Sequence, residues 1–154
     1  MAQLRASQHT RTRVHGFEPM PEFRAKLKQR MAPFGDRVEI HPHGIGVETT
    51  TLCIVPLGQA GIQSFVVDPS DPRCATGVVR KRNRDGGAGK NVSILSAAYM
   101  LQQFERIDLL HINCEGCEVD VLRGLTALQA RPFVHRVKAI EVQFHLPRVA
   151  PATY

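Results

Sequence analysis

The 154-residue sequence predicts one α/β domain built around a mainly parallel sheet. Short apolar runs alternate along the chain with segments of helical periodicity, which is the pattern of strands joined by helices. Residues 107–128 show this most clearly, because an apolar run passes directly into an amphipathic stretch. A composition of 43% hydrophobic and 22% charged residues suits one globular domain, so no second domain is expected.

The chain is first expected to form a strand at residues 14–17 and then a helix. Pro21 suits the first turn of that helix, because the N–H that proline lacks would have no helical partner there. Three apolar side chains recur at every fourth position, which gives the helix one face that can pack on a sheet: Phe23, Leu27 and Met31.

Two further strands are expected at residues 38–41 and 51–56, with a flexible turn at 44–46 between them. Residues 57–91 contain scattered glycine and proline and predict a loop-rich surface insertion. Within this insertion only residues 62–67 have the pattern of a strand.

The last third of the chain predicts a helix, a strand, a second helix and a final strand. Either Ser93 or Ser96 is expected to cap the first helix, which would run to Phe104. The other three elements are expected at 107–112, 117–128 and 137–144. Gly124 is expected to end or loosen the last turn of its helix.

The net charge of +6 comes largely from two basic patches, at residues 1–13 and 80–90. Neither forms a continuous stripe with interleaved aromatic side chains, as a surface for nucleic acid would. Both are therefore expected to be solvated surface, and no nucleic-acid partner is expected.

Four cysteines occur in a chain with no secretory signal and no long apolar span. This combination favours a reducing, cytoplasmic compartment and argues against a disulfide framework. No membrane association is expected, and the oligomeric state stays open.

Polar side chains follow the apolar run at 107–112 just before the next helix begins. These are Asn113, Glu115 and Glu118. Ligands of open α/β sheets bind beyond the carboxyl ends of the strands, so this junction is the expected place for chemistry. The alternative is that the two acids only complement the positive end of the helix.

The stretch IDLLHINCEGCEVDVLRGL at 107–125 resembles the most characteristic segment of the FkbM-type methyltransferases, which are S-adenosylmethionine-dependent O-methyltransferases. The family usually has Lys at His111, Asp at Asn113 and a small apolar residue at Cys117. The stretch VHGFEPMPE, from Val14, is similar to the V-x-x-F-E-P-x-P segment of the same family. The resemblance implies a partial Rossmann-like class I methyltransferase sheet with helices on both faces.

The resemblance also implies where the cofactor, S-adenosylmethionine, would bind. Glu18 would accept hydrogen bonds from the ribose hydroxyls, as acids beyond the second strand of dinucleotide-binding folds do. Phe17 and Pro19 would flank it, and Gly44 and Ile45 would lie against the adenine ring. An ordinary turn is the alternative for the last two residues.

Methyl transfer to a hydroxyl needs orientation and a base. Glu115 is the first candidate for the base or for a substrate-orienting acid, and Glu118 belongs to the same group. His111 is a second candidate, although alternation along its strand is expected to bury it as a core histidine. Asn113 can only hydrogen-bond. The expected acceptor is a hydroxyl of a small molecule or glycan.

By this resemblance, residues 14–146 form an incomplete methyltransferase domain that contains the insertion at 57–91. A polar basic segment, 1–13, precedes it and a tail, 147–154, follows. The family begins with a strand and a turn of the form D-x-G-x-x-x-G, and nothing before Val14 matches this. A truncated domain with unpaired central strands is therefore expected.

The cysteines allow two other interpretations, a redox pair and a zinc site. For the redox pair, Cys114 and Cys117 form a C-x-x-C between a strand and a helix, where a thiolate would be stabilised, so thiol–disulfide exchange is one alternative function. The neighbouring acids and the absence of tryptophan argue against it. Apart from the cysteines, the other alternative to an active methyltransferase is that the chain is a non-catalytic fragment.

A zinc site would need Cys53 and Cys74 together with two of His41, His43 and His111. Their spacing matches no zinc finger, so Cys53 is expected in the core, Cys74 in a loop, and no metal site is expected.

Overall fold

The computed structural model describes residues 12–57, 63–67, 74, 89–114 and 116–145. The chain divides into two compact units, residues 1–42 and 43–154. Within the described residues, no helix is both long and apolar enough to cross a membrane.

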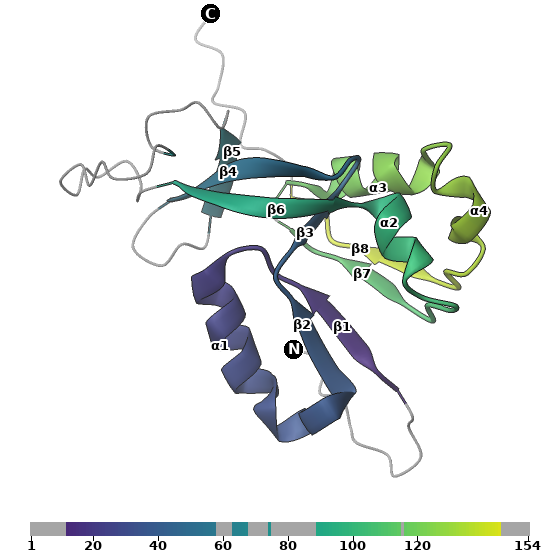
Figure 1. Ribbon diagram of the computed structural model, residues 1–154, viewed down its shortest axis with the longest axis horizontal. Coiled ribbons are helices and arrows are strands. Elements are labelled where there is room, and N and C mark those ends of the chain that lie inside the picture. Colours follow the sequence, from purple (N-terminus) through teal and green to yellow (C-terminus); the bar gives the residue numbers. More distant parts are fainter. Residues whose placement is uncertain (1–11, 58–62, 68–73, 75–88, 115, 146–154) are drawn as a thin grey trace, which may run out of the picture. The chain divides into compact units, whose positions relative to one another are not determined.

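The first unit is a strand, helix and strand (Figure 1). Strand β1 (Val14–Phe17) pairs in parallel with β2 (Val38–His41), and α1 (Pro21–Met31) followed by the 3-10 helix η1 (Ala32–Arg37) connects them. Gly35 has a φ of 58°, a conformation that glycine adopts without strain, and it turns the chain back toward β2.

Helix α1 packs on the face of this sheet that carries Gly16 and Ile40. A Cβ placed on Gly16 would lie 2.8 Å from Cδ1 of Ile40 and 3.8 Å from Cδ2 of Leu27. The predicted strands and helix of this unit are all confirmed, and Phe23, Leu27 and Met31 are the half-buried stripe that the spacing predicted.

The second unit contains a four-stranded sheet in the order β3-β6-β4-β5. Its strands are β3 (Gly44–Gly46), β4 (Thr50–Leu57), β5 (Gln63–Val67) and β6 (Lys90–Ser96). Strand β6 pairs in parallel with β3, whereas β4 is antiparallel to both β5 and β6. The expected turn at residues 44–46 is therefore a strand, and the strands predicted at 51–56 and 62–67 are confirmed.

A second, two-stranded parallel sheet in this unit joins β7 (Leu110–Ile112) to β8 (Ile140–Val142). An isolated bridge between Ile107 and Val137 extends the pairing toward the start of each strand. The helices are α2 (Ala97–Gln102), α3 (Glu118–Thr126) and α4 (Arg131–Val134). The α/β class is thus confirmed, but three small sheets stand where one parallel sheet was expected.

The prediction of a helix from Ser93 was wrong, because residues 90–96 form β6. Val92 and Ile94 are both buried and alternate with more exposed neighbours, which is the period of a strand. Ser96 is the N-cap instead: its Oγ accepts the Tyr99 N–H at 3.1 Å, and α2 begins one residue later.

Gly124 does not end α3 but lies inside it, at the contact with β3. A Cβ at this position would be 2.6 Å from the carbonyl oxygen of Gly46 and 3.0 Å from Cβ of Ala97. Helix α3 and strand β3 can approach this closely because Gly124 and Gly46, which have no side chains, lie at the contact. The expectation that Gly124 ends the helix was therefore wrong.

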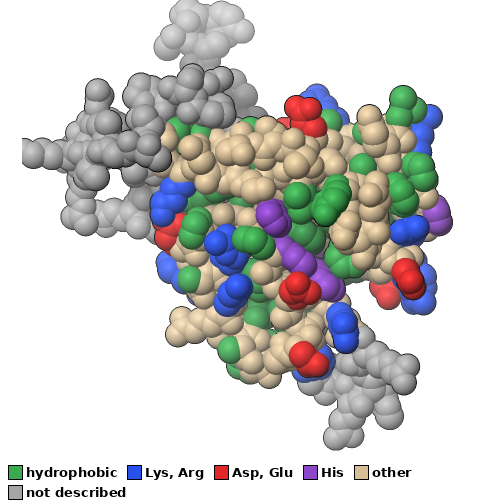
Figure 2. All heavy atoms as spheres, viewed as in Figure 1, with side chains coloured by type: hydrophobic (Ala, Val, Ile, Leu, Met, Phe, Trp, Pro, Cys, Tyr) green, Lys and Arg blue, Asp and Glu red, His purple; other side chains and the backbone are tan. Residues whose placement is uncertain are grey.

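The core of the second unit lies between its helices and strands, and its members are apolar and at most 7% exposed: Val92, Ile94, Ala97, Ala98, Met100, Leu101, Ile112, Val121, Leu125 and Ala130. Other hydrophobic side chains reach the surface around α3 and α4, where Figure 2 shows them in green. Leu128 is 70% exposed and Val119 is 47% exposed.

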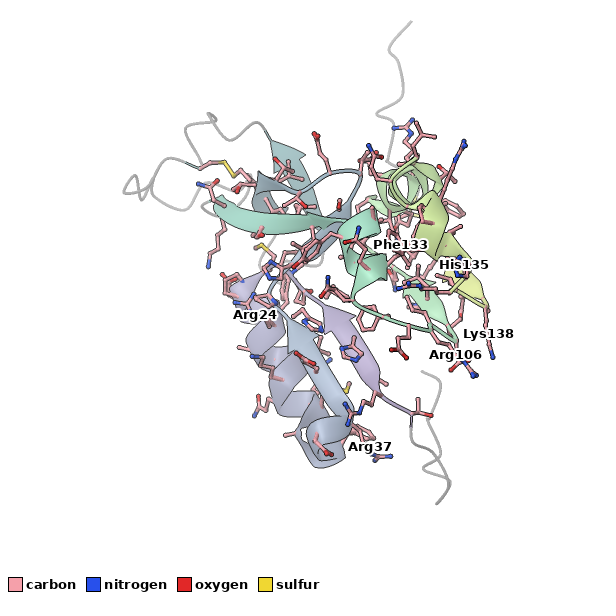
Figure 3. The ribbon with its side chains drawn as sticks, turned by 45° about the vertical axis from the view of Figure 1, so that its right-hand side comes forward. Arg24, Arg37, Arg106, Phe133, His135 and Lys138 are labelled. Atoms are coloured by element: carbon pink, nitrogen blue, oxygen red, sulfur yellow. A yellow bond between two sulfur atoms is a disulfide. The ribbon has the colours of Figure 1, made fainter. Side chains whose placement is uncertain are left out.

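Charged side chains meet near the start of β7 and β8. Arg106 donates from Nε to Oδ1 of Asp108 at 2.8 Å, and Nζ of Lys138 lies 3.3 Å from the same oxygen. Figure 3 shows Arg106 and Lys138 side by side. The hydrogen bond from Arg106 is the main reason that the pKa of Asp108 falls below its ordinary value.

Candidate active site

The junction between β7 and α3 carries a buried carboxylate. Among the described residues, Glu118 is the one buried charged side chain, and it is 1% exposed. It is the first residue of α3, directly after the loop that leaves β7. A buried charge is stable only if it is paired and hydrogen-bonded, so its partners define the site.

Three donors surround the Glu118 carboxylate. The backbone N–H of Cys114 donates to Oε1 at 3.1 Å, and that of Gly116 donates to Oε2 at 3.0 Å. Nδ1 of His145 lies 2.9 Å from Oε1. Gly116 has a φ of 113°, a region that other residues rarely adopt, so its glycine identity allows the loop to close on the carboxylate.

Glu118 is ionised at neutral pH. Burial by itself would raise the pKa of this carboxyl, but the hydrogen bonds from His145 and from the backbone N–H groups outweigh burial and lower the pKa to about 2. The site therefore holds a fixed negative charge next to an imidazole.

Polar side chains continue from this pair along the ends of β7 and β8. Nδ2 of Asn113 donates to Oε1 of Gln143 at 3.2 Å, and Nε2 of Gln143 lies 3.5 Å from Nε2 of His145. The Gln143 N–H donates to the Ile112 carbonyl at 2.9 Å and so aligns the two strand ends. Parallel strands thus bring four polar side chains together beyond their carboxyl ends.

Sequence reasoning missed Gln143 and His145. A usable signal was present, because Glu141, Gln143 and His145 are polar at alternate positions and so fall on one side of an extended segment.

His111 is not a core histidine, as alternation had suggested. Its side chain is 48% exposed, and Nδ1 lies 3.7 Å from Oε2 of Glu141 on the paired strand. Ile112 occupies the core instead and is 5% exposed. The expectation placed the strand on the wrong face, because the run 107–112 is apolar on both sides.

Glu18 follows the last residue of β1 and is half-buried. Its N–H donates to the His41 carbonyl at 3.1 Å, and its Oε1 accepts the Met20 N–H at 2.8 Å. Burial raises the pKa of this carboxyl, although the Met20 N–H and the nearby Arg24 partly oppose the rise. A partly dehydrated carboxylate of this kind gains from hydroxyl donors.

The backbone around Glu18 is held by Arg24. Its Nη1 donates to the carbonyl oxygens of Glu18 and Pro19, at 3.2 Å each. Phe17 stacks on His41, with ring centroids 4.7 Å apart. The loop that carries Glu18 is therefore fixed at both ends by contacts inside the first unit.

The family model described as the methyltransferase FkbM domain matches residues 3–153. The chain belongs to the FkbM methyltransferase family. No curated protein and no solved structure matches it. The match supports a methyltransferase and gives no support to the alternative of thiol–disulfide exchange.

The other cofactor candidates of this FkbM methyltransferase lie in the second unit. Gly44 is buried and Ile45 is half-buried, and both belong to β3, where they pair with Ile94 and Leu95 of β6. They are therefore not in the ordinary turn that was the alternative. Glu115, the first candidate base, lies outside the described residues.

All four cysteines form disulfides, Cys53 with Cys74 and Cys114 with Cys117. The argument against a disulfide framework was therefore wrong, since it rested on composition and on the absence of a secretory signal. Cys53 and Cys74 are both buried and pack with Val55, so they cannot supply the zinc ligands considered above. The Cys114–Cys117 bond closes the loop whose N–H groups bind Glu118.

Proposed function

We propose that this chain is an S-adenosylmethionine-dependent methyltransferase that methylates a hydroxyl of a small molecule or glycan. The observation that carries the proposal is the Glu118–His145 pair, a buried ionised carboxylate 2.9 Å from an imidazole at the carboxyl ends of two parallel strands. Oxygen methylation needs a group that takes up the hydroxyl proton, and a carboxylate-held imidazole is suited to this.

His145 is the proposed base. Its Nδ1–H would donate to Glu118, which fixes the tautomer and leaves Nε2 as the nitrogen that accepts the proton. The ionised Glu118 then stabilises the imidazolium that forms. Asn113 and Gln143 form the polar rim beside Nε2 and would orient the acceptor.

When bound, S-adenosylmethionine supplies an electrophilic methyl group on a sulfonium. His145 would take up the hydroxyl proton of the acceptor as its oxygen receives that methyl group, and the ionised Glu118 would balance the positive charge gained by the imidazole. The protein contributes alignment of the two reactants and the base.

Glu18 is the proposed ligand of the ribose. Its carboxylate is half-buried, and one oxygen, Oε1, is engaged by Met20, so the chemistry of the group fits two hydroxyl donors. Phe17 and Pro19 adjoin it in the first unit, and Gly44 and Ile45 of β3 are the proposed adenine contacts.

The family also supports a Rossmann-like arrangement. In each unit a parallel strand pair is connected through helices: α1 lies between β1 and β2 in the chain, and α3 and α4 lie between β7 and β8. This strand–helix–strand motif is the repeating element of Rossmann-like sheets.

Calorimetry with S-adenosylmethionine tests the cofactor assignment. The wild-type chain should bind, and Glu18→Gln should bind about tenfold to a hundredfold more weakly, because it loses charge-assisted hydrogen bonds. Glu22→Gln, the same change in the first turn of α1, is the matched control and should bind like wild type. The absence of both a heat of binding and a thermal shift for the wild-type chain at high S-adenosylmethionine concentration would contradict the proposal.

Methyl transfer itself is then measured by incubating the chain with isotopically labelled S-adenosylmethionine and a panel of polyhydroxylated acceptors. The expected product gains one labelled methyl group on oxygen, detected by mass spectrometry. Transfer only to amines or thiols would contradict the acceptor class while leaving the cofactor assignment intact.

A further inference from the structure

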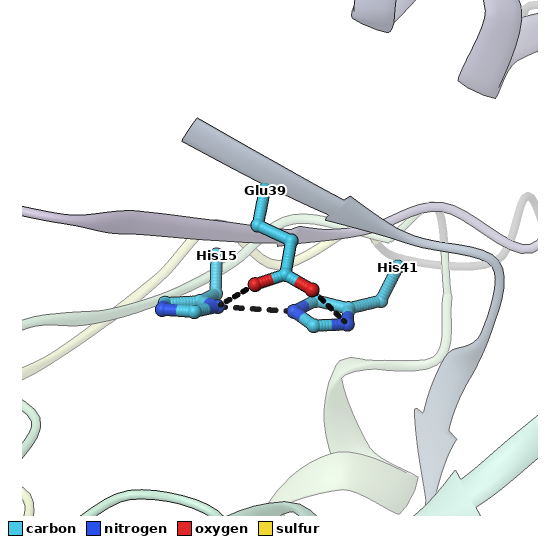
Figure 4. A group of neighbouring side chains, drawn as sticks. All are labelled: His15, Glu39 and His41. Carbon is cyan, nitrogen blue, oxygen red and sulfur yellow. Dashed lines mark hydrogen bonds and ion pairs between the residues drawn. The ribbon is translucent and has the colours of Figure 1, made fainter. Parts of the chain in front are cut away.

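Three metal-ligating side chains lie together on one face of the β1–β2 sheet (Figure 4). The parallel register places His15 opposite Glu39, and His41 follows Glu39 by two residues on β2. Side chains at these positions point to the same side of a sheet. Helix α1 packs on the other face, through Gly16 and Ile40, so the group belongs to the face that the helix does not cover.

The ligand atoms are already close to one another. Nδ1 of His15 lies 3.0 Å from Nε2 of His41 and 3.6 Å from Oε2 of Glu39. One ligand atom from each of the three residues falls within 4.8 Å of the other two. In a tetrahedral zinc site, bonds of about 2.1 Å place neighbouring ligand atoms roughly 3.4 Å apart. The His15–His41 and His15–Glu39 separations are within about 0.4 Å of this spacing. The Glu39 carboxylate lies 3.8 Å from Nδ1, the other nitrogen of His41, so the exposed Glu39 side chain would have to turn toward Nε2 to complete the group around one ion.

The two imidazoles are held in place by packing. Phe17 stacks on His41 with an interplanar angle of 18°, and the rings of His15 and His41 lie within 17° of parallel. Their side chains are 27% and 25% exposed, whereas Glu39 is 65% exposed. Packed imidazoles beside a more exposed carboxylate make a site that an ion can reach from solution.

We propose that His15, Glu39 and His41 bind a divalent transition-metal ion of the zinc type. Two imidazoles and one carboxylate suit zinc, cobalt and nickel rather than magnesium or calcium, which prefer oxygen ligands. Without metal, the proton shared between His15 and His41 holds the nitrogens together. The ion would replace that proton, and water would complete its coordination.

The second unit offers an internal comparison. His111 and Glu141 occupy directly paired positions on β7 and β8, as His15 and Glu39 do on β1 and β2, and Nδ1 of His111 lies 3.7 Å from the Glu141 carboxylate. No third ligand joins that pair among the described residues. The second histidine is therefore what distinguishes the proposed site from an ordinary cross-strand ion pair.

Binding of the ion would also affect the end of β1. The carbonyl oxygen of His41 accepts the N–H of Glu18 at 3.1 Å, so an ion that fixes His41 also fixes the strand ends from which the Glu18 loop begins. The metal site is argued from its own geometry and does not depend on the proposed methyl transfer.

The test is a titration of the full, untagged and metal-stripped chain with Zn²⁺ by calorimetry and with Co²⁺ by visible absorption. One equivalent should bind, with the Co²⁺ bands of nitrogen and oxygen ligation. His15→Gln, Glu39→Gln and His41→Gln should each weaken binding by more than about tenfold, because each removes a direct ligand. His111→Gln, the matched control, should leave the affinity unchanged.

Circular dichroism and thermal unfolding of each variant without metal show whether it is folded, so lost binding cannot be mistaken for unfolding. If one substitution prevents folding, the remaining two variants still test the site. The proposal is overturned if the wild-type chain binds no Zn²⁺ or Co²⁺, or if the three variants bind as tightly as His111→Gln.

Discussion

Nδ1 of His145 lies 2.9 Å from Oε1 of Glu118, a carboxylate that is 1% exposed. The two residues are 27 positions apart in the sequence, and parallel pairing of β7 with β8 brings them together. The same carboxylate accepts two backbone N–H groups of the preceding loop. Glu118 is therefore expected to stabilise the fold and to orient His145, the proposed base.

Glu118→Gln should destabilise the fold by about 3 kcal/mol at neutral pH, since its pKa falls from the ordinary 4.5 to about 2 on folding. A lowered pKa means that the ionised form stabilises the folded chain. This stabilisation is complete above pH 4.5 and is lost as the pH falls from there to about 2. Urea unfolding across this range measures it.

Glu141→Gln is the control for that experiment, because Glu141 is 66% exposed and pairs with His111 at the surface. It should change the unfolding free energy by less than about 1 kcal/mol. Equal losses in both variants would show that the burial of Glu118 contributes no stability of its own.

His145→Gln should lower kcat for methyl transfer by about a hundredfold or more, because it removes the proposed base. The affinity for S-adenosylmethionine should stay unchanged. The measurement is a pH profile of kcat, in which the wild-type chain should show a rise with pH that the variant lacks. His135→Gln, at an exposed histidine labelled in Figure 3, should keep the wild-type profile.

Glu18→Gln should leave stability unchanged or raise it slightly at neutral pH while it weakens cofactor binding. Burial raises the pKa of Glu18, so the protonated form stabilises the fold below the ordinary pKa, and this contribution is lost as pH rises through the raised value. The neutral amide avoids that loss and can still accept the Met20 N–H. Urea unfolding at acidic and neutral pH should show that the variant gains unfolding free energy over the wild-type chain at neutral pH alone. A variant that loses more unfolding free energy at neutral pH than at acidic pH would contradict this prediction.

Gly124→Ala should destabilise the chain by about 1–2 kcal/mol, although alanine favours helices by about 1 kcal/mol over glycine. Its Cβ would lie 2.6 Å from the Gly46 carbonyl oxygen and would push α3 away from β3. Val119→Ala, at a position 47% exposed on the same helix, is the control and should be close to neutral. Thermal unfolding compares the two, and a stabilised Gly124→Ala would mean that helix and strand separate without cost.

The first unit was predictable because its signals are local. The strand at 14–17, the proline at the first turn of α1 and the stripe of Phe23, Leu27 and Met31 each depend on neighbours within a few residues. The strand at 90–96 was not recognised, because its serines also suit a helix N-terminus. In the structure these residues form a strand because they pair with β3 on one side and β4 on the other.

The candidate site was predicted only in part, and the reason is also physical. Asn113 and Glu118 follow a strand in the sequence and could be found there, whereas their partners Gln143 and His145 reach them through the parallel pairing of β7 with β8. The metal-ligating group has the same property, since His15 and Glu39 meet only through the register of β1 and β2. Alternation can mark Gln143 and His145 as one side of an extended segment, but it does not show which strand that segment pairs with.

The Cys53–Cys74 bond joins residues 21 positions apart and starts from the middle of β4. Cross-linking a loop of that length lowers the conformational entropy of the unfolded chain and so stabilises the fold by about 3 kcal/mol. Doubling the length of the linked segment would change the loop-closure entropy by only about 0.6 kcal/mol. In evolutionary terms, homologues can therefore lengthen or shorten the segment between these two cysteines at little thermodynamic cost, as long as both cysteines are kept.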